Sequence, residues 1–173
     1  AVIGQHDKAE ASFKQALRID GENSSVLNNY GQFLCQRGRY DEGQKLILKA
    51  VANPLYANAD SGYYNAGACA MGNGKLDEAD GYFRKALEID SSMAPALLQM
   101  ADVNLQLNRA LQARAYLQRF SGVATMNARA LWLGVQIERQ LGNRDDEASY
   151  ALQLQKSFPD SVQTKQLLES KPQ

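Results

Sequence analysis

Few residues of this chain have the spacing that acid–base catalysis would need. Those that do are better explained as residues at the starts of helices. Paired carboxylates occur at Asp41-Glu42, Asp77-Glu78 and Asp145-Asp146, each pair beginning three residues after a glycine. Two carboxylates could serve as general acid and base, but negative charge is also favourable in the first turn of a helix. Because each pair opens a segment of helical periodicity, we interpret all three as helix-start residues. The single histidine, His6 beside Asp7, is expected at the surface.

Other catalytic and ligand-binding patterns are missing from the sequence. It contains no GxxxxGKS/T or GxGxxG phosphate loop, no HExxH metal motif and no GxSxG nucleophile turn. The two cysteines, Cys35 and Cys69, form no CxxC motif, and a zinc site would need about four ligands. We therefore predict a protein that is not an enzyme and that holds neither a metal nor a cofactor.

The composition argues against strongly electrostatic partners. The 173 residues include 19 Lys and Arg and 19 Asp and Glu, so the formal net charge is zero. Such a chain has no net field to attract nucleic acid or an anionic membrane. Apolar residues make up 45%, as in a globular protein, and no apolar run approaches the roughly 20 residues of a membrane span. We expect neither nucleic acid nor direct membrane insertion.

A helical phrase recurs along the chain and would position these residues. Its copies begin at Gly4, Gly38, Gly74 and Gly142. In two copies, small and aromatic residues share a spacing of four and then three: Ala9, Phe13 and Ala16, then Ala79, Phe83 and Ala86. That spacing puts them on one face of a helix. The glycines of the later copies stand where a preceding helix must end, because glycine adopts the left-handed conformation at little cost.

A second phrase alternates with the first and centres on a small residue. The small residues are Gly31, Gly67, Ala101 and Gly134, at intervals of 36, 34 and 33 residues. Two alternating helical phrases at this interval are typical of the tetratricopeptide repeat, a helix-turn-helix unit of about 34 residues. The small residue lets a neighbouring helix approach closely, while large residues such as Tyr30 and Phe83 fill the layer between helices.

We therefore predict an all-α tetratricopeptide solenoid of about four and a half repeats with a further C-terminal helix. The expected elements are a half-repeat over residues 1–20, hairpins over 24–53, 60–91, 94–121 and 127–159, and a helix over 161–169 capped by Asp160 or Ser161. The connections over 53–60 and 121–126 are irregular, and the last hairpin is expected to have a longer inner turn. We expect one superhelical domain over 1–173, from a longer chain whose N-terminal repeats are missing here.

The first helix of each hairpin lines the concave groove of such a solenoid, which is a protein-binding surface. Its inner positions are expected to be exposed, and they carry amide, apolar and aromatic side chains and few charges. The candidate partner-binding residues are Asn28, Asn29, Gln32, Tyr64, Asn65, Leu98 and Asp102. Amides could pair with the backbone of an extended segment or helix, and Tyr64 could anchor it. The alternative is that several of these side chains only face solvent.

One known use of the fold, the clamping of a chaperone's terminal carboxylate, does not fit the sequence. That clamp relies on lysines of the inner helices. Residues 24–36 and 60–73 contain neither Lys nor Arg. We therefore reject a chaperone co-adaptor.

Cys35 and Cys69 fall on the first helices of two consecutive hairpins, which are neighbours in a solenoid. The residues around Cys69 are small, which would permit close approach. A disulfide needs Cα atoms within about 7 Å. On the residues alone, a disulfide and two free buried thiols are equal alternatives. A disulfide would imply an oxidising compartment.

Several segments resemble the PilF/PilW family of type IV pilus pilotins. They are Val26 to Cys35 (VLNNYGQFLC), Arg39 to Glu42, Asn53 to Tyr56, Asn65 to Gly67, Met100 to Asp102, and Asn127 to Gly134 (NARALWLG), followed by Ser149-Tyr150 and Leu152 to Leu154 ahead of Phe158-Pro159. The resemblance spans nearly the whole chain and includes its irregular spacings.

The resemblance implies a periplasm-facing lipoprotein on the inner leaflet of the Gram-negative outer membrane. Proteins of this family help the secretin subunit to reach that membrane and form its multimeric pore. The family has more repeats than this chain, and its lipidated cysteine has no counterpart in these residues. Membrane attachment would therefore come only through a lipid anchor absent here. Some members have both cysteines, paired, which favours a Cys35–Cys69 disulfide.

We accordingly predict a monomeric, non-enzymatic assembly factor whose protein partner is the secretin subunit. One alternative is a generic tetratricopeptide scaffold in another complex. The other is an enzyme decorated with these repeats, which would need a catalytic segment that the sequence does not contain.

Overall fold

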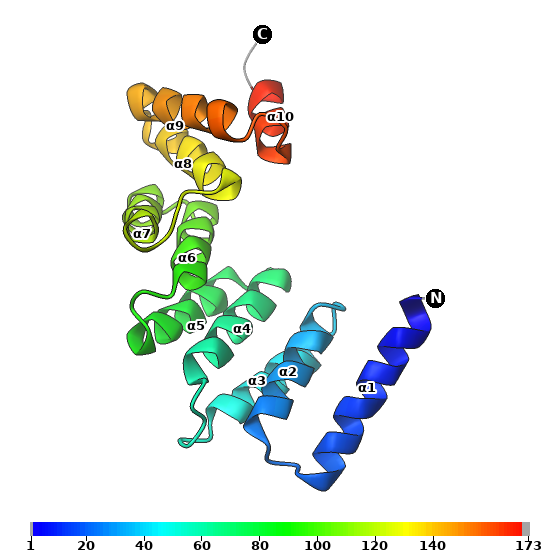
Figure 1. Cartoon of the computed structure of the whole chain (residues 1–173). Helices are drawn as coiled ribbons and strands as arrows, with labels where there is room; N and C mark the ends of the chain where they lie inside the picture. The colour runs from blue at the N-terminus through cyan, green and yellow to red at the C-terminus, as the bar shows by residue number, and fades with distance from the viewer. Residues whose placement is uncertain (1, 171–173) are drawn as a thin grey trace. The chain divides into compact units, whose positions relative to one another are not determined.

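The computed structural model of the protein describes residues 2–170, with side chains from His6 onward. Over these residues the chain forms ten helices and no strand (Figure 1). The helices are α1 (Val2–Ile19), α2 (Ser24–Cys35), α3 (Tyr40–Val51), α4 (Ala59–Gly72), α5 (Leu76–Ile89), α6 (Ala94–Gln106), α7 (Ala110–Val123), α8 (Ala128–Leu141), α9 (Arg144–Ser157) and α10 (Val162–Glu169). The predicted all-α fold of helical hairpins is confirmed.

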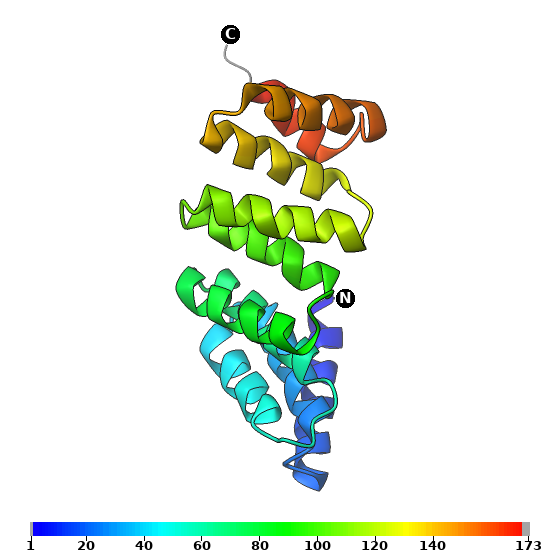
Figure 2. The same cartoon turned by 90° about the vertical axis from the view of Figure 1, so that its left-hand side faces the viewer.

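The helices pair as hairpins in chain order. α2 packs on α3, α4 on α5, α6 on α7 and α8 on α9 (Figure 2). α1 lies against α2, and α10 packs on α8 and α9. Contacts divide the chain into two compact units, with α1 to α5 in the first, up to Ser91, and α6 to α10 in the second. The single superhelical domain stays a prediction.

Two connections differ from their predicted form. Helix α7 continues past residue 121 to Val123, because Phe120 is buried and its carbonyl oxygen still accepts from Ala124 N at 2.9 Å. The expectation of a longer inner turn in the last hairpin is wrong. Only Gly142 and Asn143 separate α8 from α9. Gly142 adopts a φ of 73°, which reverses the chain at once.

The inner turns of all four hairpins use one left-handed residue. Gly38, Gly74 and Gly142 have φ values of 77°, 73° and 73°. In the third hairpin, which lacks the glycine, Asn108 takes its place with a φ of 58°. Asparagine tolerates this conformation better than most residues, so the turn is retained without glycine.

In the first unit, glycines let the two helices of a hairpin touch. A Cβ on Gly31 of α2 would lie 2.6 Å from the carbonyl oxygen of Gly43 and 2.6 Å from Ile47 Cγ1, both on α3. A Cβ on Gly67 of α4 would lie 2.6 Å from the ring of Phe83 on α5, which is fully buried. Any larger residue at Gly31 or Gly67 would force the two helices apart.

The second unit repeats this arrangement. A Cβ on Gly134 of α8 would lie 2.8 Å from the ring of Tyr150 on α9. Ala101 of α6 is fully buried. Leu131 and Leu154 pack with Leu167, so α8, α9 and α10 share one apolar cluster.

Helix α1 is held to α2 by aromatic packing and to Arg39 by an ion pair. Phe13 stacks on Tyr30 with ring centroids 5.2 Å apart. The Glu10 carboxylate pairs with Lys14 at 2.8 Å and accepts hydrogen bonds from Arg39 Nη1 at 2.9 Å and Tyr30 Oη at 3.0 Å. Lys14, Arg39 and Tyr30 thereby lower the pKa of Glu10 from 4.5 to about 2.

The contact at Gly67 predicts a pair of opposite effects. Gly67→Ala would place its Cβ against the buried Phe83 ring and should lower the free energy of unfolding by about 1–3 kcal/mol. The matched control is Gly81→Ala on α5, where an added Cβ meets nothing within 4 Å. That control should raise stability by about 0.5–1 kcal/mol through helix propensity. Urea denaturation measures both variants, and equal effects would contradict the packing argument.

The Glu10 ion pairs predict a pH-dependent contribution to stability. The pKa of about 2 in the fold lies below 4.5, so the contribution is complete above pH 4.5 and is lost as pH falls towards 2. Glu10→Gln should therefore lower stability by about 1 kcal/mol near neutral pH and have no effect near pH 2. Glu42→Gln, at a more exposed partner of Arg39, should cost less. The test compares thermal unfolding midpoints with the parent across this range, and a constant difference would refute it.

Candidate protein-binding surface

The predicted groove residues of the first unit bond to one another across α2 and α4. Gln32 Nε2 donates to Asn65 Oδ1 at 3.1 Å, and Asn65 Nδ2 donates to Asn28 Oδ1 at 3.1 Å. Asn28 Nδ2 in turn donates to Asn29 Oδ1 at 3.5 Å. The expected exposure of Asn28 is wrong, because its side chain lies inside this chain of amides and is only 5% exposed. Asn29 and Gln32 are exposed and can also meet a partner.

A hollow of about 370 Å³ opens between α2 and α4, beside these amides. Its lining includes the amides of Gln32, Gln36 and Asn65 and the rings of Tyr40 and Tyr64, and none of its lining residues carries a charge. Half-buried Tyr64 is held in the wall of the hollow by packing on Phe83, because the centroids of the two rings are 5.7 Å apart. Amides and tyrosines together offer hydrogen bonds and apolar contact, which suits a peptide segment.

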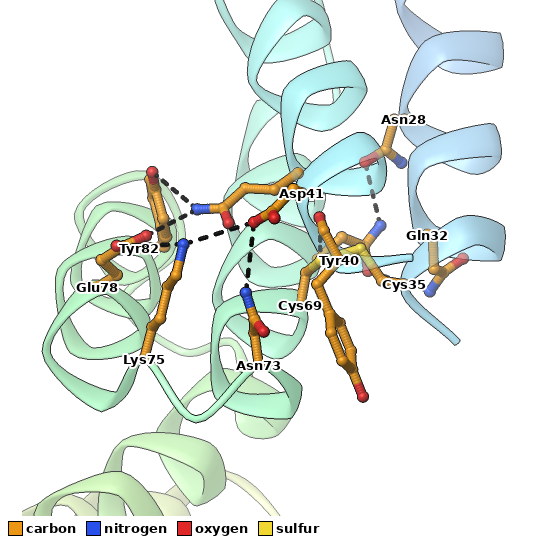
Figure 3. The surroundings of a disulfide bond; sticks show 12 residues. Asn28, Gln32, Cys35, Tyr40, Asp41, Cys69, Asn73, Lys75, Glu78 and Tyr82 are labelled. Atoms are coloured by element: carbon orange, nitrogen blue, oxygen red, sulfur yellow. Dashed lines mark hydrogen bonds and ion pairs between the residues drawn. A yellow bond between two sulfur atoms is a disulfide. The ribbon is translucent and has the colours of Figure 1, made fainter. Parts of the chain in front are cut away.

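Cys35 and Cys69 also line the hollow, and a disulfide joins them (Figure 3). Their Cα atoms are 5.3 Å apart, so the bond connects α2 directly to α4. Gly43 of α3 makes room for it, because a Cβ there would clash with Cys35 Sγ. Of the two alternatives that the residues left open, the structure has the disulfide.

Figure 3 also shows a polar network that the sequence did not single out. Gln44 of α3 is buried, and its Nε2 donates to Glu78 Oε2 at 3.0 Å and to Tyr82 Oη at 3.3 Å, both on α5. Lys75 Nζ lies 3.6 Å from Asp41 Oδ1 and 3.8 Å from Glu78 Oε1. The network ties α3 to the start of α5.

A sequence signal for these pairs exists in the repeat period. Gln44 and Glu78 are 34 residues apart, as are Cys35 and Cys69, and Gln32 and Asn65 are 33 apart. Residues separated by one repeat occupy equivalent positions on neighbouring hairpins, so complementary side chains at that separation can meet, as these three pairs do. Reading the sequence at this offset would have found the amide pair and the Gln44 contact.

The two remaining groove candidates lie in the second unit. Leu98 of α6 is buried, with 7% exposed, so it belongs to the core more than to the surface. Asp102 is half-buried and is engaged by Arg129 Nη2 of α8 at 2.7 Å and by Gln106 Nε2 at 2.8 Å. Arg129 neutralises its charge, so Asp102 does not present an isolated carboxylate to a partner.

The described part of the chain lacks two further kinds of feature. Among those residues, no group of three or more His, Cys, Asp and Glu side chains is arranged to hold a metal ion. None of the described helices combines the length and apolar character needed to cross a membrane.

Comparison with known proteins places this geometry in a family. Tetratricopeptide repeats are recognised at residues 4–59 and 61–92. The type IV pilus assembly protein PilF of Pseudomonas aeruginosa is 34% identical over 155 residues, which are 90% of this chain and 62% of PilF. The crystal structure of PilW, a widely conserved type IV pilus biogenesis factor, matches with a TM-score of 0.89 and 32% identity, covering 96% of this chain and 77% of the solved chain. The chain belongs to the PilF/PilW family.

A solved structure of P. aeruginosa PilF agrees, with a TM-score of 0.83 and 32% identity over 94% of this chain and 73% of that structure. The resemblance seen in the sequence motifs is thereby confirmed. This chain of the PilF/PilW family spans less than two thirds of the length of PilF itself.

The disulfide predicts a large and reversible stability difference. Its cysteines are 34 residues apart, and closing a loop of that size in the unfolded chain should contribute about 3–4 kcal/mol. Urea denaturation with and without reductant should show this difference in the parent. A Cys35→Ala, Cys69→Ala double variant should not respond to reductant. Two alkylatable thiols in chain purified from an oxidising compartment would contradict the bond.

Proposed function

We propose that this protein is a non-enzymatic assembly factor of type IV pilus biogenesis. It binds the secretin subunit and assists its localisation to the outer membrane and its multimerisation into a pore. The observation that carries the proposal is the 34% identity to PilF across 90% of the chain. The repeat family is typically a non-catalytic scaffold, which supports a binding role.

The proposed binding surface of the first unit is the uncharged hollow between α2 and α4. Gln32 and Gln36 are exposed along its α2 wall and can pair with the backbone of a bound segment. Tyr64 offers an aromatic face held in place by Phe83. The hydrogen bonds between α2 and α4 arrange the amides before the partner arrives, which reduces the entropy lost on binding. In the second unit, the corresponding candidates are Asp102, which Arg129 contacts, and Leu98.

The proposed location is the periplasmic face of the Gram-negative outer membrane, with a lipid anchor in the full-length protein. The Cys35–Cys69 disulfide supports this placement, because such bonds persist in oxidising compartments like the periplasm. We propose that the protein acts there as a monomer.

Binding measurements with the purified secretin subunit of the same organism test the function and the surface together. Gln32→Ala and Tyr64→Ala should each weaken binding about tenfold, because they remove an amide contact and an aromatic anchor, and neither side chain is itself buried. The matched controls are Gln112→Ala and Tyr116→Ala on α7, which should leave affinity unchanged.

The outcomes separate surface from function. If the parent chain fails to retain the secretin at all, the function is wrong and a scaffold role in another complex takes its place. If the parent binds but the α2 and α4 variants bind equally well, the function stands and the surface is wrong.

A further inference from the structure

A groove of about 560 Å³ follows α9 in the second unit, between that helix and α10. It begins at Arg144 and ends at Gln155, so it runs along three turns of α9. Ala148 lies four residues after Arg144, and Ala151 and Leu152 lie four and three residues before Gln155. This spacing puts all of them on one side of the helix. The groove is distinct in its lining from the uncharged α2–α4 hollow of the first unit.

The groove exists because α10 covers α9 only in part. α10 has 8 residues, whereas α8, which packs on the preceding α7, has 14. Its attachment is nonetheless firm. Ser161 caps its first turn by accepting from Thr164 N, and Leu167 is 1% exposed in the cluster with Leu131 and Leu154. A second helix therefore finds a fixed wall to lie against.

The floor of the groove is apolar. Ala148 and Ala151 leave space for close approach, and buried Leu167 closes the α10 side. Leu152 stands at the edge with 67% of its surface exposed. An extended strand in such a groove would leave backbone N–H and C=O groups without partners, whereas a helix satisfies its own. The surface therefore fits an α-helix with an apolar stripe.

The rim of the groove carries one uncommitted positive charge. Arg139 is occupied, with Nε 2.7 Å from Glu147 Oε1 and Nη1 3.4 Å from Ser170 Oγ. Arg144 is exposed, and within residues 6–170 no ion pair or hydrogen bond engages its guanidinium. A carboxylate on the bound helix would complement it, since guanidinium–carboxylate pairs are strong and directional.

We propose that the α9–α10 groove binds an amphipathic helical segment of the secretin subunit, with an acidic residue beside its apolar stripe to meet Arg144. This inference rests on the proposed function for the identity of the partner. It adds a second docking site, for a different kind of segment than the one that the α2–α4 hollow would hold. A groove of three helical turns takes a segment of roughly ten to twelve residues.

The probes are fluorescein-labelled peptides of about 18 residues, overlapping along the secretin subunit of the same organism and long enough to form a helix. At least one should bind the parent chain and become helical on binding, as measured by circular dichroism. The sequence of that peptide should have apolar residues with a helical period of 3.6 and an acidic residue beside that apolar stripe. Leu152→Glu should weaken its binding at least tenfold. The matched control is Leu111→Glu, an equally exposed leucine of α7 at 66%, which should leave binding unchanged.

A charge exchange tests the role of Arg144. Arg144→Glu should weaken binding of the acidic peptide several-fold, and replacing the peptide's acidic residue by lysine should restore it. The inference is overturned if no peptide binds while the intact secretin does, or if Leu152→Glu leaves the affinity for the bound peptide unchanged. In either case the proposed function still stands. It is also overturned if the chain retains no secretin, because the proposed function itself then fails.

Discussion

The close approach of paired helices at glycine is the contact on which the first unit depends. Gly31 on α2 meets Gly43 and Ile47 on α3, so the two backbones lie nearly in contact. The same Gly43 leaves the space in which Cys35 Sγ sits. The separation of α2 from α3, the position of the disulfide and the shape of the hollow that it lines therefore depend on the same two glycines. A side chain at either glycine would change all three features. Glycine therefore shapes the candidate site although it contributes no functional group to it.

The repeat period turns this local contact into an architecture. Residues about 34 apart occupy equivalent positions on successive hairpins, and complementary pairs at that offset hold one hairpin to the next. The Cys35–Cys69 disulfide, the Gln44–Glu78 hydrogen bond and the Gln32–Asn65 amide pair all follow this rule. The two hydrogen bonds are weak individually and the disulfide is strong, but all three join the α2–α3 hairpin to the α4–α5 hairpin. Together they make the surface of the first unit a preformed one.

Helix positions followed from the sequence because they depend on local signals. The glycines predicted the inner turns, and Asn108 could substitute for one because it tolerates the same conformation. The state of individual side chains did not follow, because it depends on the neighbouring helix. Asn28 has the helical position of a groove residue, yet it turns into a hydrogen bond with Asn65. Leu98 is likewise buried in the core. Helix α10 leaves α9 partly uncovered because it is short, and the hydrophobic periodicity of the sequence does not predict that consequence.

The absence of charged side chains from the lining of the α2–α4 hollow has a kinetic consequence. Opposite potentials on two proteins steer them together and can raise association rates to about 10⁸–10⁹ M⁻¹s⁻¹, whereas neutral surfaces associate at about 10⁵–10⁶ M⁻¹s⁻¹. A neutral hollow on a chain with no net charge has no such steering. Binding at this proposed surface is therefore expected to depend on the concentration of the partner and hardly at all on the salt concentration. Confinement to a shared membrane face would compensate, because it raises the local concentration of both molecules.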